Sequence, residues 1–124
     1  LHRLQEQYKL TYVFISHDLS VVEMISDRIA VMYLGFVVET APKEKLYAMP
    51  AHPYTQALLS AVPIPDPDRQ HERIILEGDI PSTINLPAGC PFAALCKMCK
   101  PVCLEQRPET KEVESGHFVA CHQV

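Results

Sequence analysis

The chain has 124 residues, which is the usual length of a single domain. Hydrophobic residues make up 48% of it and charged residues 21%, so the composition is that of a globular protein and excludes a disordered one. The net charge of −4 argues against a nucleic-acid binder, which needs a basic face, and no apolar run reaches the roughly 18 residues of a membrane span.

Residues 1–8 predict the end of an amphipathic surface helix. Leu1, Leu4 and Tyr8 recur at helical spacing, with polar and charged residues between them. This charged pattern differs from that of a secretory signal peptide. Because the chain does not begin with methionine, we expect it to be a piece of a longer protein.

The next thirty residues predict an alternation of strands and helices. Residues 11–15 (TYVFI) are β-branched and aromatic, which is typical of a strand buried on both faces in a parallel sheet. Asp18 is a suitable N-cap for a helix over residues 19–25. Two further strands are expected over residues 28–33 and 36–39. This order of elements indicates the α/β fold class.

His17 directly follows the first predicted strand. Ligands of open α/β sheets bind outside the carboxyl ends of the strands, where an imidazole can contact a phosphate oxygen or position an attacking water. By position alone, however, a polar residue that merely ends a strand is the better interpretation.

Residues 11–39 (TYVFISHDLSVVEMISDRIAVMYLGFVVE) resemble the switch-histidine segment of ABC transporter ATPase subunits, which are P-loop NTPases. The resemblance implies that His17 is the catalytic-site histidine that contacts the γ-phosphate of ATP. It also implies that the two following strands close the nucleotide-binding core, and that ATP and Mg2+ are the cofactors of the intact subunit.

Three other ABC motifs are missing from the sequence. It contains no phosphate loop of the form G-x-x-x-x-G-K-S/T, no LSGGQ-like signature and no apolar run that ends in Asp-Glu. In the family these motifs lie upstream, so we expect the chain to start after them. Without a cradle of backbone N–H groups and a lysine, we expect this chain alone neither to bind ATP tightly nor to hydrolyse it.

The middle of the chain predicts two short helices, over residues 42–48 and 53–61, each with proline at its first position. His52 and Tyr54 are expected to form a helix-start turn with an aromatic anchor. They also belong to a segment, HPYT followed by LL, Ala and Pro, that resembles the oligopeptide and dipeptide branch of the ABC ATPases.

Residues 63–68 (PIPDPD) predict a stiff acidic linker. We therefore divide the chain into residues 1–62, the end of the ABC ATPase domain, and residues 63–124, a C-terminal extension. All eleven prolines lie from Pro42 onward, so this extension is expected to be rich in loops. One short strand is predicted within it, over residues 73–76 (RIIL).

Five cysteines, spaced C-x5-C-x2-C-x3-C-x17-C, lie in the extension. An odd number of cysteines without an export signal is unfavourable for a disulfide framework. Structural zinc needs four thiolate or imidazole ligands, and His117 or His122 could complete such a site. A [4Fe-4S] cluster needs four thiolates. The spacing by itself does not choose between zinc and iron.

The stretch GCPFAALCKMCKPVCLEQRPE…GHFVACH resembles the C-terminal extension of the oligopeptide/dipeptide transporter ATPases. The resemblance implies a [4Fe-4S] cluster bound by Cys90, Cys96, Cys103 and Cys121. Cys99 is then a spare thiol, and His117 and His122 lie outside the ligand set or face solvent. Zinc stays the alternative, because the pair Cys96-x2-Cys99 resembles one half of a zinc knuckle. Because the extension has little material for a core, the bound metal is expected to stabilise it.

Taken together, the resemblance implies an α/β fold: the C-terminal remnant of a P-loop NTPase (ABC ATPase) core followed by a small cysteine-containing extension. It implies the ATP-binding subunit of an importer of di- and oligopeptides, an ATPase only when intact. The implied partners are a second ATP-binding subunit, transmembrane permease subunits and, indirectly, a solute-binding protein, at the cytoplasmic face of the membrane. No nucleic-acid partner is expected.

Two alternatives remain open at this point. The chain could be a metal-stabilised regulatory or interaction module unrelated to ATP, or part of a nickel importer. Independently of these alternatives, the strand predicted over residues 11–15 lacks its sheet partners in this chain, and its unpaired edges predict self-association.

Overall fold

The computed structural model describes residues 1–63, residue 68 and residues 72–124. In chain order the described residues form α1 (His2–Tyr8), α2 (Leu19–Ile25), β1 (Arg28–Tyr33), β2 (Phe36–Pro42), α3 (Lys43–Ala48), α4 (Pro53–Ser60), the 3₁₀ turn η1 (Ala93–Leu95), α5 (Pro101–Glu105), β3 (Thr110–Glu114) and β4 (His117–Ala120). The four predicted helices are confirmed to within a residue or so at each end. None of the helices in this described part is long and apolar enough to cross a membrane.

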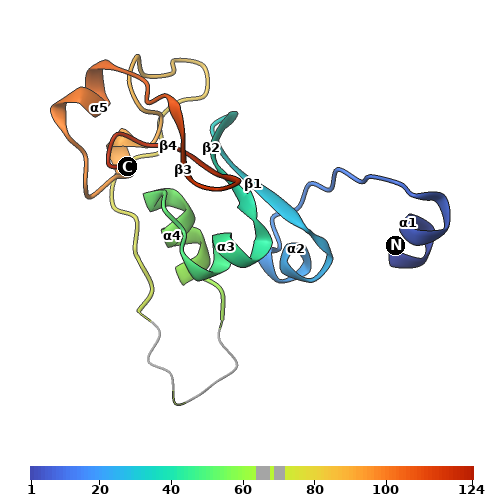
Figure 1. Ribbon diagram of the computed structural model, residues 1–124. Helices are drawn as coiled ribbons and strands as arrows, with labels where there is room; N and C mark the ends of the chain where they lie inside the picture. The colour runs from blue at the N-terminus through green and yellow to red at the C-terminus, as the bar shows by residue number, and fades with distance from the viewer. Residues whose placement is uncertain (64–67, 69–71) are drawn as a thin grey trace.

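The strands form one antiparallel sheet in the order β1-β2-β4-β3 (Figure 1). β1 and β2 make a hairpin whose two turn residues, Leu34 and Gly35, have positive φ angles of 49° and 83°. Positive φ at both central residues matches the twist of the flanking strands, so this tight turn sets their pairing. The α/β class is confirmed, and the sheet is antiparallel.

The C-terminal hairpin, β3 and β4, completes the sheet. β4 pairs with β2, with Val119 opposite Glu39 and Phe118 opposite Thr40. Residues from both sides of the boundary predicted at residues 62 and 63 therefore build one sheet, while the division into two domains stays a prediction. The linker predicted over residues 63–68 lies mostly outside the described residues, because residues 64–67 are not among them.

Two predicted strands are wrong. Residues 11–15 are irregular and exposed, with Val13 at 92% and Ile15 at 93%, because no strand among the described residues pairs with them. Figure 1 shows this segment running out from the sheet toward α1. Residues 73–76 are also irregular: the backbone N–H of Ile74 donates to Ser60 Oγ at the end of α4 (2.9 Å) instead of to a neighbouring strand.

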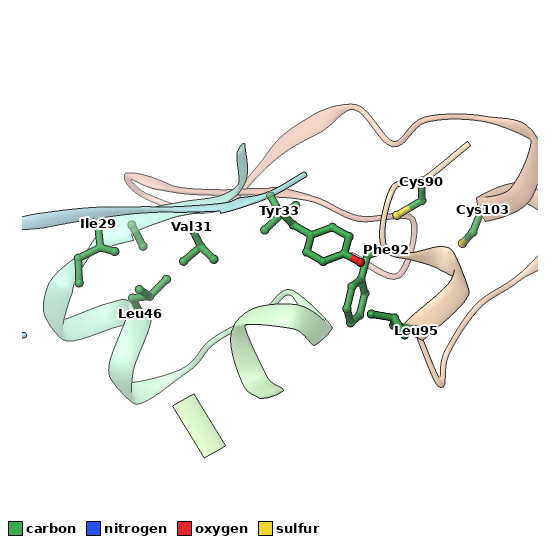
Figure 2. Close-up of a cluster of buried hydrophobic side chains, with 10 residues drawn as sticks. Ile29, Val31, Tyr33, Leu46, Cys90, Phe92, Leu95 and Cys103 are labelled. Atoms are coloured by element: carbon green, nitrogen blue, oxygen red, sulfur yellow. The ribbon is translucent and has the colours of Figure 1, made fainter. Parts of the chain in front are cut away.

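The core lies on one face of the sheet. Alternate residues of β1, namely Ile29, Val31 and Tyr33, point toward it. Leu46 of α3 lies beside Ile29 and Val31, and the Tyr33 ring extends toward Phe92 (Figure 2). The same buried cluster continues into the extension through Cys90, Phe92, Leu95 and Cys103. The extension thus shares a core with the β1–β2 hairpin and does not rest on metal ligands alone.

Side chains from the first half of the chain also hold the turn of the C-terminal hairpin. The Arg28 guanidinium donates to the carbonyl oxygen of Gly116 (2.7 Å), and Lys45 Nζ donates to that of Ser115 (2.8 Å). Gly116 has a φ of 74°, which favours glycine in this turn. The two cations fix the turn of the β3–β4 hairpin against the first half of the chain.

Candidate functional site

His17 lies in the loop between the irregular segment and α2, and its side chain is exposed. The loop is shaped by Asp18, whose carboxylate accepts hydrogen bonds from the backbone N–H groups of Ser20 (3.0 Å) and Val21 (3.3 Å). The predicted N-cap is confirmed. The role of His17 toward ATP stays a prediction.

The predicted metal ligands come from four separate stretches of chain. Cys90 precedes η1, Cys96 follows it, Cys103 belongs to α5 and Cys121 follows β4. The backbone N–H of Cys90 donates to the carbonyl oxygen of Cys103 (2.7 Å). Gly89 permits this close approach, since a Cβ at that position would overlap the same carbonyl oxygen.

Electrostatic interactions among the thiols indicate that these stretches lie together. Burial raises the pKa of Cys90, a hydrogen bond from the Phe92 backbone opposes this, and Cys103, Cys121 and Cys96 raise the pKa further. Burial also raises the pKa of Cys96, to which Cys121 and Cys103 contribute. The mutual interactions of Cys90, Cys96, Cys103 and Cys121 therefore indicate that these four predicted ligands lie near one another.

Cys99, the predicted spare thiol, is less buried than Cys90, Cys103 and Cys121, and it interacts electrostatically with Cys103 and Cys96. Its side chain is half-buried, and its Sγ donates to the carbonyl oxygen of Lys100 (3.6 Å). Cys103 Sγ instead accepts from the backbone N–H of Lys100 (3.5 Å). Cys90, Cys103 and Cys121 are buried. Cys99 thus lies at the rim of the thiol group.

The donor atoms, but not their arrangement, are those of a thiolate-bound metal site. All five cysteines are free thiols, and sulfur ligands favour zinc and iron–sulfur clusters. A buried polar atom without a partner, the Tyr33 hydroxyl, lies in the same core cluster as Cys90. As the side chains stand, however, no three His, Cys, Asp or Glu residues of the described chain are arranged to hold a metal ion. The ligand set stays a prediction.

Glu39 and His117 form a buried polar pair between β2, β4 and the start of α4, which the sequence analysis did not identify. Glu39 is buried, and its Oε1 is 2.6 Å from Nε2 of His117. The same carboxylate accepts from the backbone N–H groups of Ala51 (2.9 Å) and His52 (3.0 Å). The signal in the sequence was a single acid within an apolar strand, VVETA.

The two C-terminal histidines have different surroundings. His117 is only 3% exposed, so it does not face solvent. His122 lies near the surface, and its Nε2 donates to the carbonyl oxygen of Gln106 (2.8 Å). His117 joins the C-terminal hairpin to Glu39, and His122 joins the chain end to the residue that follows α5.

The interpretation of His52 and Tyr54 as a helix-start turn is confirmed. His52 is the N-cap of α4, and its Nδ1 accepts from the backbone N–H of Tyr54 (3.0 Å). The Tyr54 ring packs against Tyr33 and Phe92, with centroids 4.7 and 5.5 Å away. Burial lowers the pKa of His52 to about 4, and Glu39 opposes this shift.

Residues 38–103 match the family described as the oligopeptide/dipeptide transporter, C-terminal region. The chain belongs to this family. The matched range begins in β2 and ends in α5, so it includes the His52 turn and the first four of the chain's five cysteines. His17 and Cys121 lie outside it.

Curated relatives match nearly the whole chain. The oligopeptide transport ATP-binding protein AppF of Bacillus subtilis is 55% identical over 124 residues, and YkfD of the same organism, which is also named for oligopeptide transport, is 53% identical. A Brucella ovis protein named for peptide import and ATP binding is 55% identical over 121 residues. Each match covers 98% of this chain but only 38% of the relative.

Proposed function

We propose that the chain is the C-terminal part of the ATP-binding subunit of an ABC importer, which couples ATP hydrolysis to the uptake of di- and oligopeptides. The observation that carries this proposal is the identity of 53–55% with peptide-transport ATP-binding proteins across 98% of the chain. Peptides are preferred to nickel as the solute because those relatives are named for peptide transport.

In this proposal His17 contacts the γ-phosphate of ATP in the intact subunit. Its exposed position beside the capped start of α2 leaves the imidazole accessible to a ligand held by another part of the protein. ATP and Mg2+ would bind elsewhere, since this chain has no phosphate loop. His17 would orient the attacking water or stabilise the charge on the transferred phosphoryl group.

The test of this role is ATP turnover by the intact subunit. His17→Ala is expected to lower turnover roughly 100-fold or more while ATP binding is retained. His2→Ala, which removes an exposed histidine from α1, is the matched control and should leave turnover unchanged. Equal turnover in both variants would refute the role of His17. The chain alone, mixed with ATP, is expected to show no turnover above its His17→Ala variant.

The partners follow from the same proposal. An ATP-binding subunit acts with a second such subunit and with transmembrane permease subunits at the cytoplasmic face of the membrane, and a solute-binding protein acts through the permease. Co-purification of the intact subunit with its permease from detergent-solubilised membranes is the expected result. A subunit that remains entirely apart from membrane proteins would count against the proposal.

We further propose that Cys90, Cys96, Cys103 and Cys121 bind a [4Fe-4S] cluster, with zinc as the alternative occupant. The mutual electrostatic interactions of these thiols support this proposal. When bound, the metal would crosslink α5 and the chain end to the loop around Cys90, so its contribution is structural. An interaction module stabilised by metal without ATP remains the competing function.

Metal content tests this second proposal. After anaerobic purification, elemental analysis is expected to find iron with inorganic sulfide, or zinc, in the wild-type chain. Cys121→Ser should lose the metal and become more sensitive to protease, whereas the matched Cys99→Ser variant should keep both metal and protease resistance. Unchanged metal content in Cys121→Ser would contradict the ligand assignment.

A further inference from the structure

The side chain of Ser16 bonds to the backbone on the far side of His17. Its Oγ accepts a hydrogen bond from the backbone N–H of Asp18 (3.0 Å), two residues further along the chain. Serine can form such a turn because its short side chain reaches the N–H group two residues on. The ring that this hydrogen bond closes contains the backbone of His17, so it restricts the φ and ψ angles of that residue.

On its C-terminal side, His17 adjoins a capped helix. The Asp18 carboxylate accepts from the backbone N–H groups of Ser20 (3.0 Å) and Val21 (3.3 Å) and so fixes the start of α2. Asp18 therefore bonds to Ser16 through its own N–H and to the helix through its side chain. His17 is exposed, but its backbone is held between a side-chain turn and a capped helix.

The start of α2 is in turn attached to the core. The Tyr47 hydroxyl of α3 donates to the carbonyl oxygen of Leu19, the first residue of α2 (2.8 Å). Just beyond the other end of this helix, the backbone N–H of Lys43 donates to the carbonyl oxygen of Asp27 (3.0 Å). Tyr47 itself packs against the buried cluster. The helix is therefore a fixed base, and the Ser16 turn sets how the chain at His17 leaves it.

The chain on the N-terminal side of His17 has no comparable support. Among the described residues, no hydrogen bond between backbone groups holds residues 11–17, and Ile15 is 93% exposed. A loop without backbone pairing can turn about its φ and ψ angles. The Ser16 hydroxyl therefore restrains His17 from this side.

We propose that Ser16 is a positioning residue for His17: its hydroxyl fixes the backbone from which the imidazole is presented to the γ-phosphate. This inference rests on the role of His17 proposed above. In this role Ser16 touches neither ATP nor the attacking water. A catalytic group must be held close to its productive geometry, and a small displacement slows the reaction without preventing substrate binding. Loss of the hydroxyl should therefore lower kcat and leave the KM for ATP unchanged.

Steady-state ATP turnover by the intact subunit tests the proposal. Ser16→Ala should lower kcat roughly 3- to 10-fold, as expected for the loss of one ordinary hydrogen bond, with KM unchanged. Ser16→Thr keeps a hydroxyl that can form the same turn and should restore kcat. Ser26→Ala, which removes a hydroxyl from the half-buried serine that follows α2, is the matched control and should leave kcat unchanged.

A double variant shows whether Ser16 acts through His17. Ser16→Ala combined with His17→Ala should be no slower than His17→Ala alone, because the imidazole that the hydroxyl positions is already absent. A double variant slower than His17→Ala would overturn the inference. A Ser16→Ala subunit that fails to fold, or a loss confined to KM, would overturn it as well, because the hydroxyl would then serve stability or binding.

The single variants separate this inference from the proposed function. If His17→Ala turns over ATP at the wild-type rate, the role of His17 and the inference are both overturned. If His17→Ala is slow but Ser16→Ala matches Ser26→Ala, or Ser16→Thr is as slow as Ser16→Ala, the inference alone is overturned.

Discussion

The chain contains two short runs of β-branched and aromatic residues that have different fates. In β1, Ile29, Val31 and Tyr33 are 8–9% exposed, whereas Val13 and Ile15 in the run at residues 11–15 are more than 90% exposed. β1 pairs with β2 and is covered by α3, and the first run pairs with no described strand. An apolar run in the sequence thus predicts burial, but the run becomes buried only where neighbouring strands and helices pack against it.

The largest expected effect contrasts Phe92, which packs against Tyr33 of β1, with Phe14 of the exposed run. Phe92 is 1% exposed, so Phe92→Ala should leave a cavity and lower the free energy of unfolding by about 3–5 kcal/mol. Phe14 is 51% exposed, so Phe14→Ala should change it by less than about 0.5 kcal/mol. Urea denaturation measures both. Similar losses in the two variants would show that residues 11–15 are packed in solution.

The next effect tests the polar group that joins the two halves of the sheet. Glu39→Ala leaves the two backbone N–H groups and the His117 imidazole without their buried acceptor. We expect the free energy of unfolding to fall by about 3–5 kcal/mol. Glu39→Gln retains one acceptor oxygen and should lose less. If Glu39→Ala lost under about 1 kcal/mol, Glu39 would not be what joins β2 to β4.

A pH titration sharpens the comparison, because residues 11–15 contain no buried titratable group. The pKa of His52 is lowered to about 4 in the folded chain, against 6.5 when unfolded. As the pH falls below 6.5, His52 is protonated in the unfolded chain before it is protonated in the folded chain, and this difference favours unfolding. The stability that neutral His52 contributes is therefore fully present above pH 6.5 and is lost as the pH falls toward 4. The loss attributable to His52 is about 3 kcal/mol.

The control for this titration is His52→Asn, because asparagine can still cap α4 but does not titrate. Chemical denaturation between pH 7 and pH 4 should show a shallower decline for the variant than for the wild type. Parallel declines would show that His52 does not set this part of the acid sensitivity.

The smallest effect on stability comes from charging the exposed run. Val13→Lys combined with Ile15→Lys should leave the free energy of unfolding within about 0.5 kcal/mol of the wild type. The double variant should reduce the predicted self-association, measured by light scattering at high concentration, since charged residues block strand pairing. Met24→Lys, at another exposed apolar position, should not reduce it. A wild-type chain that stays monomeric would contradict the prediction.

Some residues of the candidate site could be identified from local sequence, and others only from contacts between distant parts of the chain. The cysteine positions and the resemblance of their spacing were sufficient to nominate four ligands, and the sequence also nominated His17. The interaction of Glu39 with His117 joins residues 78 positions apart, and no periodicity of either segment predicts it. Likewise, only the tertiary structure shows that the Tyr33 hydroxyl is buried without a hydrogen-bond partner.

The sequence by itself determined the elements whose energetics are local. These are the Asp18 cap and the start of α4 at Pro53, each of which depends on backbone groups within a few residues. Only the tertiary structure decided whether residues 11–15 form a strand, which strands adjoin β2, and how Cys121 reaches the other thiols. A strand needs hydrogen-bond partners from elsewhere in the chain, and a buried polar group needs a distant counterpart, so neither can be determined from one segment alone.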